Sequence, residues 1–161
     1  MANRKTLVGV IGAAAAGLLI AFTAGNEGTR NAPYQDIGGV WTVCDGQTRV
    51  QMRYYTDTEC NAMLGNTLAQ YAAQIQAMTP GFETLPDGVK VATVDFGYNV
   101  GLGTYQRSSL RTKLIARDLP QACDVFLLYK FAGGRDCSQK GSGCQGVWNR
   151  RLAERQMCLG K

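Results

Sequence analysis

The chain has 161 residues, 45% of them hydrophobic, which suits one folded domain with a core and excludes a disordered or multi-span membrane protein. It contains no histidine, which excludes Ser-His-Asp and Cys-His catalysis and zinc hydrolase sites built on histidine ligands. Carboxylates are therefore the expected acid and base if the chain is a hydrolase, and we expect no metal and no organic cofactor.

The net charge of +5 is spread unevenly. Residues 27–89 carry three basic and seven acidic side chains, whereas residues 90–161 carry twelve basic and five acidic ones. A basic half is attracted to anionic polymers and lipids, but it is equally typical of a solvated helical surface. The charge alone therefore leaves the partner open.

A hydrophobic segment follows a short basic end with Arg4 and Lys5. Residues 6–25 carry no charge, and these 20 residues are long enough to cross a bilayer as a helix, although many are Ala or Gly, which makes insertion weak. The basic end is expected to stay cytoplasmic, which places the chain from Glu27 onward outside. We favour an uncleaved membrane anchor over residues 1–26 and a separate domain over residues 27–161. A cleaved signal peptide and a buried core helix are the alternatives.

The next elements are expected in the following order. A short helix is expected over residues 27–35, a hairpin over 36–43 and a further strand over 48–55. Thr56 and Glu59 form a capping-box pattern, which predicts a helix that continues through residues 61–78. Further helices are expected over residues 86–100, 108–117, 120–131 and 146–159. The fold class is therefore α+β, with a small β-rich lobe early in the chain and a helical lobe after it.

The cysteines are even in number and none lies in a CxxC pair, so three disulfides in an oxidising compartment are expected. The pair that flanks the loop CSQKGSGC is expected to form locally, and the other four cysteines allow three pairings. We favour Cys44 with Cys60 and Cys123 with Cys158 beside the local pair of Cys137 with Cys144, although the sequence alone does not fix the connectivity.

Glu27, Asp36 and Thr42 form the pattern E-x8-D-x5-T. Hydrolysis of a glycosidic bond needs an acid that protonates the leaving oxygen and a second carboxylate that acts on the opposite face of the sugar. A threonine hydroxyl can hold a water molecule. The pattern is weak by itself, because two acids and one threonine fall at such a spacing in many proteins.

The blocks around this pattern are more specific. The spacing followed by GGVWTVCDG resembles the active-site region of phage endolysins related to the T-even phage lysozyme, glycoside hydrolase family 24. VDFGYNVGLGTYQRSSLRTKL resembles the family's F-x-x-N-x-G-x-G-x-F-x-x-S-x-L block, and GVWNRRLAERQMC is similar to its closing G-L-x-x-R-R-x-x-E-x-x-x-C segment. The resemblance spans residues 27–159. The Ala/Gly-rich start further resembles the signal-anchor-release endolysins of that family.

The resemblance implies a lysozyme-like fold, with a small β-hairpin lobe, a larger helical lobe and an N-terminal hydrophobic anchor. By position, Glu27 matches the catalytic acid, Asp36 the second carboxylate and Thr42 the residue that positions the water, in an inverting mechanism. Tyr98 and Ser109 align with positions that touch the saccharide in relatives, but packing or capping roles are as compatible with the sequence.

Two further expectations concern the last helix and the tryptophans. The resemblance implies that Arg150 or Arg151 reaches the Glu27 carboxylate; a pair with Glu154 within the same helix is the alternative. Trp41 and Trp148 are expected in the core rather than as sugar platforms.

Together these expectations describe a monomeric muramidase that hydrolyses the β-1,4 bond between N-acetylmuramic acid and N-acetylglucosamine in bacterial peptidoglycan and so lyses the host. It would be tethered to the host inner membrane, facing the periplasm, and would act after release into the periplasm. A lytic transglycosylase, which needs one glutamate and leaves anhydro ends, and a non-catalytic cell-wall-binding module are the alternatives. Nucleic acid is not an expected partner, because the chain from Glu27 onward is expected to lie outside the cytoplasm.

Overall fold

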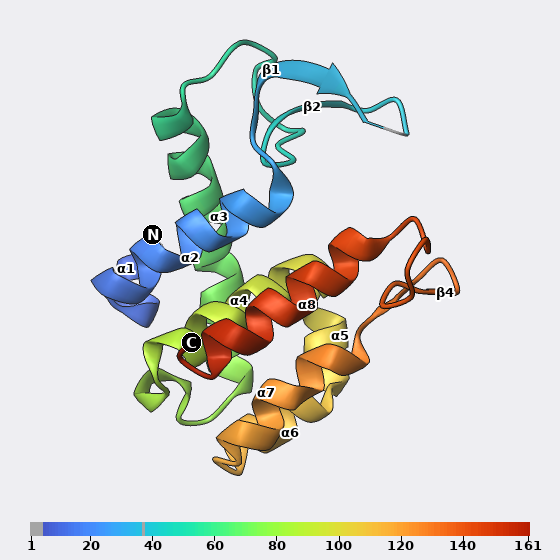
Figure 1. The fold of residues 1–161 in the computed structure, drawn as a ribbon. Helices are drawn as coiled ribbons and strands as arrows, with labels where there is room; N and C mark the ends of the chain where they lie inside the picture. Colours follow the sequence, from blue (N-terminus) through green and yellow to red (C-terminus); the bar gives the residue numbers. More distant parts are fainter. Residues whose placement is uncertain (1–4, 37) are drawn as a thin grey trace.

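The computed structural model describes residues 5–36 and 38–161. Residues 1–4, with Arg4 of the expected basic end, and Ile37 of the expected hairpin lie outside the described residues. Figure 1 shows a small lobe with the antiparallel hairpin of β1 (Arg30–Gln35) and β2 (Trp41–Cys44), and a larger lobe of helices. The predicted α+β class, with a small β lobe and a larger helical lobe, is confirmed.

The elements after the hairpin follow the expected order closely. They are α3 (Asp57–Met78), η1 (Phe82–Thr84), α4 (Asp87–Val100), α5 (Leu102–Arg107), α6 (Ser109–Ile115), α7 (Leu119–Val125), η2 (Phe126–Leu128), the short hairpin of β3 (Phe131–Ala132) and β4 (Arg135–Asp136), and α8 (Gln145–Cys158). The helix expected over residues 120–131 is shorter than predicted, because α7 gives way to the single 3₁₀ turn η2.

The long helix α3 joins the two lobes (Figure 1). Its start is the predicted capping box: the Glu59 N–H donates to Thr56 Oγ1 at 3.2 Å, and the Thr56 N–H donates to Glu59 Oε2 at 2.8 Å. Both bonds satisfy N–H groups that have no partner inside the helix. The hairpin is thus connected to the helical lobe through a helix whose first turn is fixed locally.

Two local predictions are wrong. Residues 30–35 form β1 rather than a short helix, because they pair with β2 in the register Arg30↔Cys44 and Tyr34↔Thr42. Residues 48–55 form no strand. They run as an irregular segment that is joined to the hairpin by single bonds, such as that from the Tyr55 N–H to the Asn31 carbonyl at 2.9 Å.

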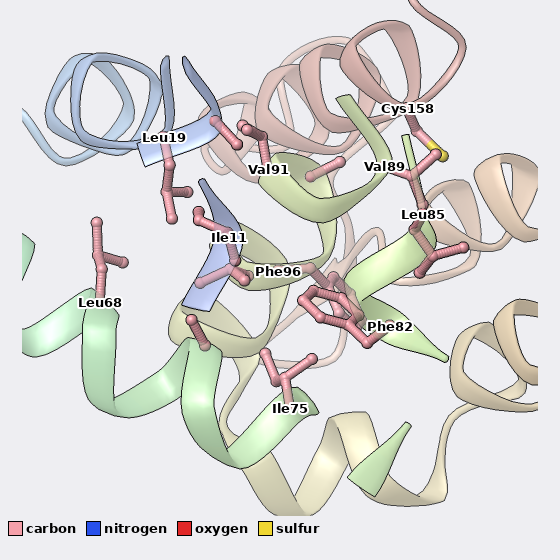
Figure 2. Packing of buried hydrophobic residues seen from close by; sticks show 14 of the residues in the cluster. Ile11, Leu19, Leu68, Ile75, Phe82, Leu85, Val89, Val91, Phe96 and Cys158 are labelled. Atoms are coloured by element: carbon pink, nitrogen blue, oxygen red, sulfur yellow. The ribbon is translucent and has the colours of Figure 1, made fainter. Parts of the chain in front are cut away.

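The core of the helical lobe is built around α4, which is apolar on nearly all sides. Val91, Val94 and Phe96 are 0% exposed. Figure 2 shows side chains from the surrounding helices converging on this core, among them Ile11, Leu19, Leu68, Ile75 and Cys158. Helices α2, α3 and α8 all contact α4, so α4 fixes their positions relative to one another.

The uncharged N-terminal segment is part of this core. It forms α1 (Leu7–Ile11) and α2 (Ala13–Glu27), which are separated at Gly12, where φ is 89°, a conformation that favours glycine. α1 packs on α3 and α2 packs on α4, and Ile11, Ala15 and Leu19 are at most 2% exposed. Among the described residues, no helix is both long and apolar enough to cross a membrane. The structure thus describes a packed form of this segment, and its role as an anchor stays a prediction.

The structure contains the three disulfides that the sequence favoured. Cys44–Cys60 joins β2 to α3, Cys123–Cys158 joins α7 to α8, and Cys137–Cys144 closes the loop before α8. The first lies in a small core of its own with Val43 and Tyr55. Cys44–Cys60 therefore attaches the hairpin covalently to α3, and Cys123–Cys158 joins two helices of the larger lobe.

Candidate active site

Glu27 is the last residue of α2. The helix ends there because Gly28 adopts the left-handed conformation, with φ at 73°. This end lies where the helical lobe meets the hairpin, three residues before β1 begins at Arg30. The Glu27 side chain is 28% exposed, and its Oε1 accepts a hydrogen bond from Nη1 of Arg150 at 2.5 Å. A glutamate is thus presented to solvent while one of its oxygens is held by a cation.

The two consecutive arginines of α8 fulfil the two expectations separately. Arg150 reaches Glu27, whereas Arg151 donates to Glu154 Oε1 at 2.7 Å and to Asn99 Oδ1 at 2.8 Å. Neighbouring residues on a helix point about 100° apart, so one arginine faces α2 and the other does not. Burial by itself would lower the pKa of Arg150, but the hydrogen bonds and charges of Asp95 and Glu27 outweigh it and raise that pKa, so Arg150 stays cationic.

Asp95 is a site residue that the sequence reasoning missed. It lies on α4, is 0% exposed, and accepts hydrogen bonds from Nε and Nη2 of Arg150 at 3.0 and 2.9 Å. The hydroxyl of Thr23, on α2, donates to it at 2.8 Å. The sequence held a clue, since Asp95 lies between the apolar residues Val94 and Phe96 in the middle of the helix, and a carboxylate buried there needs a partner.

Asp36 and Thr42 lie on the hairpin. The Asp36 N–H donates to the Val40 carbonyl at 3.0 Å, and Asp36 Oδ1 accepts from the Val40 N–H at 2.9 Å, so these two residues face each other across the turn. Thr42 lies two residues beyond Val40 on β2, opposite Tyr34. Because side chains alternate along a strand and opposite residues share a face, Asp36 and Thr42 belong to one face of the hairpin. Asp36 is exposed and Thr42 is buried.

Tyr98 and Ser109, the weaker candidates, differ in their surroundings. The Tyr98 hydroxyl donates to the Asp45 carbonyl at 3.1 Å. Burial, together with the nearby charges of Glu27 and Asp45, raises the pKa of Tyr98 to about 12, so Tyr98 stays neutral. Ser109 is the exposed first residue of α6, and no hydrogen bond of a described residue joins it to Glu27, Asp36 or Thr42. Contact of either residue with substrate stays a prediction.

Asp45 is a second residue that was missed, because Asp-Gly after a strand is an ordinary turn sequence. It is 3% exposed, and its Oδ1 accepts from the Thr29 hydroxyl at 2.6 Å. Burial raises its pKa; the Thr29 hydrogen bond opposes this, and the charges of Glu27 and Asp57 add to it. A second buried carboxyl, after that of Asp95, therefore lies near Glu27.

The prediction for Trp41 is wrong. Trp41 is 54% exposed on β2, opposite Gln35, while its neighbour Thr42 is buried. The alternation of the strand turns Trp41 to the other face. Trp148 is half-buried on α8 rather than part of the core.

A hollow of about 430 Å³ opens where α4 ends and α8 begins. Asn99 and Arg151, which are hydrogen-bonded to each other, line it together with apolar and aromatic side chains. The lining residues are Asn99, Val100, Leu128, Tyr129, Phe131, Ala132, Val147 and Arg151. An apolar hollow with a few polar groups is typical of a ligand site, and here it adjoins the arginine pair of α8.

Comparison with known proteins gives consistent matches along the chain. The family model described as phage lysozyme matches residues 24–154. The SAR-endolysin of Enterobacteria phage PA-2 is 35% identical in an alignment of 165 residues with gaps, and the alignment covers 97% of this chain and 94% of the relative. The SAR-endolysin of Enterobacteria phage P21 matches with the same identity and coverage.

Solved structures show the same fold. A variant of P22 lysozyme has a TM-score of 0.75 at 21% identity, with 88% of this chain and 95% of that chain covered. The active form of the P1 phage endolysin Lyz has a TM-score of 0.70 at 23% identity, with 91% and 83% covered. At such identities the likeness concerns the fold alone, which is lysozyme-like as predicted. Because the family match and the two curated relatives extend over most of its length, the chain belongs to the phage lysozyme family.

Proposed function

We propose that this protein is an endolysin that hydrolyses the β-1,4 bond between N-acetylmuramic acid and N-acetylglucosamine in bacterial peptidoglycan and thereby lyses the host cell. Membership of the phage lysozyme family and the SAR-endolysin relatives support this. The observation that carries the chemistry is the position of Glu27, held by Arg150 where the helical lobe meets a hairpin that bears Asp36 and Thr42 on one face.

Glu27 is the proposed general acid. Its Oε1 is occupied by Arg150, which leaves Oε2 to carry the proton toward the glycosidic oxygen. As the bond between the anomeric carbon and that oxygen breaks, the leaving sugar takes the proton and Glu27 becomes a carboxylate. Arg150 then faces a full negative charge, which it stabilises.

Asp36 and Thr42 are the proposed pair that directs the water. The Thr42 hydroxyl donates to the Val40 carbonyl at 3.0 Å, so its oxygen remains free to accept a hydrogen bond from a water. The Asp36 carboxylate takes the other proton as the water attacks the anomeric carbon from the face opposite the leaving group, which inverts the configuration. Tyr98 and Ser109 are proposed saccharide contacts; the proximity of Tyr98 to Glu27 supports the first, and only the alignment supports the second.

Product analysis on purified peptidoglycan tests the reaction. Wild-type protein should create new muramic-acid reducing ends, and Glu27→Gln and Asp36→Ala should each abolish them. Anhydro ends that survive in Asp36→Ala would instead identify a lytic transglycosylase, in which one glutamate suffices. A folded wild-type protein that binds peptidoglycan but releases no soluble fragment would leave the cell-wall-binding module.

We further infer that residues 1–26 tether the protein to the host inner membrane, with residues 27–161 in the periplasm, until release. The SAR-endolysin relatives and the absence of charge over residues 6–25 support this inference. In the packed form, Leu19 and other residues of α2 are buried against α4, and Glu27 is the end of the same helix. A membrane-inserted segment would withdraw Glu27 from the site, so the tethered protein should be inactive until loss of the membrane potential releases it as a monomer.

Leucine substitutions test the tether. Replacing Gly9, Gly12 and Gly17 together makes the segment more apolar and strains the packed form, because φ at Gly12 is 89°. This variant should stay in the membrane fraction and fail to lyse cells. Gly17→Leu alone is the matched control for packing, since no atom lies within 4 Å of a Cβ at that position. Lysis on the normal schedule by the triple variant would contradict release.

A further inference from the structure

The groups around Asp95 form a buried cluster that joins three helices. Asp95 on α4 accepts three hydrogen bonds, one from Thr23 on α2 and two from Arg150 on α8, all between 2.8 and 3.0 Å. Thr23 and Asp95 are 0% exposed, and the Arg150 side chain is 8% exposed. Removal of either charge from such a site leaves the other buried without a partner, which the fold tolerates poorly.

The three nitrogens of the Arg150 guanidinium bind two different carboxylates. Nε and Nη2 are taken by the two oxygens of Asp95, an arrangement that fixes the plane of the guanidinium. Nη1 is then aimed at Oε1 of Glu27. The direction in which Arg150 holds the proposed acid is therefore set by Asp95, which has no hydrogen bond to Glu27 among the described residues.

The charged and titratable groups near Glu27 come from several elements. Arg150 and Glu154 lie on α8, Asp95 and Tyr98 on α4, and Asp45 follows β2. Glu154 Oε1 is paired with Arg151 at 2.7 Å and lies 3.9 Å from Nε of Arg150, whereas the two oxygens of Asp95 bind Arg150 at 3.0 and 2.9 Å. Asp95 is thus the carboxylate that offsets the charge of Arg150 on the side away from Glu27.

We propose that Asp95 is a positioning residue for the general acid, which acts by orienting and partly neutralising Arg150, and that Thr23 couples this arrangement to the docking of α2. The inference rests on the proposed function, because it assigns Asp95 a part in the same reaction. Thr23 and Glu27 belong to one helix, so α2 supplies both the acid and the hydroxyl that completes the Asp95 site. Undocking of α2 breaks both contacts together.

Asp95→Asn is the direct test. The amide keeps the size of the side chain but loses the charge, and its NH₂ cannot pair with Arg150. The kcat should fall by roughly tenfold to a hundredfold through misplacement of the acid, with KM nearly unchanged. Arg150, no longer offset, should favour the ionised acid, so the alkaline fall in activity should move to lower pH by about one unit.

Asp124→Asn is the matched control for the loss of a carboxylate. Asp124 on α7 accepts from Arg155, one turn further along α8, at 2.7 Å, but it is exposed and lies outside the cluster. Its kcat and pH profile should match those of the wild type. A purely structural effect of Asp95→Asn would lower the folded fraction and leave the pH profile of the remaining activity in place.

Thr23→Val keeps the ion pair and serves if Asp95→Asn does not fold. Its kcat should fall by only a few-fold, because one neutral hydrogen bond is lost. Thr93→Val is the matched control, since Thr93 is also 0% exposed and its hydroxyl has no partner among the described residues. The Thr93 variant should retain full activity.

A physical readout separates this inference from the proposed function. In ¹H–¹⁵N spectra the Arg150 Nε–H signal should be protected from exchange in wild-type protein, weaker in Thr23→Val, lost in Asp95→Asn, and unaltered in Thr93→Val. This pattern holds or fails whether or not the protein cuts glycan, which the wild-type product assay decides. An unaltered Nε–H signal in Thr23→Val and Asp95→Asn would overturn the inference.

A double-mutant cycle completes the test. If Asp95 acts through Arg150, the combination of Asp95→Asn with Arg150→Gln should be no less active than Arg150→Gln alone, within about twofold. Losses that multiply in the double variant would show that Asp95 acts independently of Arg150 and would reject the positioning role. A wild-type pH profile in folded Asp95→Asn would reject it as well.

Discussion

Glu27 and Asp36, the two proposed catalytic carboxylates, are held by different kinds of contact. The partner of Glu27 is Arg150, 123 residues away, and Arg150 is itself fixed by Asp95, 55 residues from it. Asp36 is held by its own turn, through bonds with Val40, four residues on. The acid thus depends on the packing of the whole helical lobe, whereas the second carboxylate depends on a hairpin alone.

Because of this difference, displacement of α2 would affect Glu27 and Asp36 unequally. Displacing α2 removes the acid and leaves the hairpin bonds intact, since those bonds join only residues of the hairpin. If Glu27 and Asp36 act as proposed, the docking of α2 therefore decides whether Glu27 is in place while the hairpin stays as it is.

Glu27→Gln should have the largest effect, because it removes the proton donor itself. We expect the rate of glycan cleavage to fall by roughly a thousandfold or more. The fold should persist, since the amide oxygen of Gln can still accept from Arg150. The rate of reducing-end release and the thermal midpoint check this. Glu83→Gln, at an exposed glutamate of η1, is the control and should behave as wild type. Substantial activity in Glu27→Gln would refute the assignment of the acid.

Removal of the hairpin disulfide and removal of the helical disulfide should have different effects. Cys44–Cys60 closes a separation of 16 residues and Cys123–Cys158 one of 35. Loop entropy gives stabilisations of about 3 and about 4 kcal/mol. The double variant Cys123→Ala/Cys158→Ala should therefore lose more free energy of unfolding, measured in urea, than Cys44→Ala/Cys60→Ala. The kcat of its folded fraction should be unchanged.

Cys44→Ala/Cys60→Ala should instead lower kcat as well, because the hairpin with Asp36 and Thr42 is joined to α3 through this bond and a small core. The two double variants serve as controls for each other. Equal effects on kcat would show that the hairpin holds its position without its disulfide.

Asp36→Asn tests the local side of the contrast. The amide oxygen can accept from the Val40 N–H as the carboxylate does, so the turn should persist while the base is lost. A roughly hundredfold fall in kcat is expected. Asp57→Asn is the control: its carboxylate accepts from Asn31 at 2.7 Å in the same lobe and has no hydrogen bond to Asp36 or Thr42 among the described residues. If Asp36→Asn and Asp57→Asn lose activity equally, Asp36 has no special part in the reaction.

The features that could be predicted from the sequence are those written locally. The start of α3 follows from Thr56 and Glu59, three residues apart, and the core helix α4 from its continuous apolar pattern. The pair Cys137–Cys144 follows from the short loop between its two cysteines, whereas the other two pairings were favoured without being fixed by the sequence. The spacing of Glu27, Asp36 and Thr42 became informative only with the flanking blocks of the family.

The features that could not be predicted depend on distant partners. The strand β1 exists because β2 pairs with it, and a shift of one residue in that register would exchange the exposure of Trp41 and Thr42. Asp95 gave no local indication of which arginine it would meet. The division of the uncharged segment at Gly12 is likewise set by the surfaces of α3 and α4 on which α1 and α2 pack.

The smallest expected effect concerns Asp45, which directly follows β2 and accepts a hydrogen bond from Thr29, two residues beyond Glu27. Its carboxyl is 3% exposed, and Oδ2 has no hydrogen-bond partner among the described residues. Burial raises its pKa above the ordinary value of 3.8, so the folded protein binds this proton more tightly than the unfolded chain does. Ionisation of Asp45 therefore costs stability as the pH rises from about 4 through the raised pKa.

Asp45→Asn removes that cost, so the variant should be slightly more stable than wild type at pH 7, with a higher Tm. The difference should vanish near pH 3, where Asp45 is protonated in both states. Asp124→Asn, at an exposed carboxylate, should show no comparable gain at pH 7. A variant less stable than wild type at pH 7 would mean that the charged carboxylate of Asp45 gains more free energy from its hydrogen bond with Thr29 than the burial of its charge costs. Asp45 would then join the end of β2 to Thr29, just beyond α2, through a charge-assisted hydrogen bond. The position of Glu27 would in that case depend on the hairpin as well as on Arg150, and the contrast with Asp36 would be smaller than their direct contacts indicate.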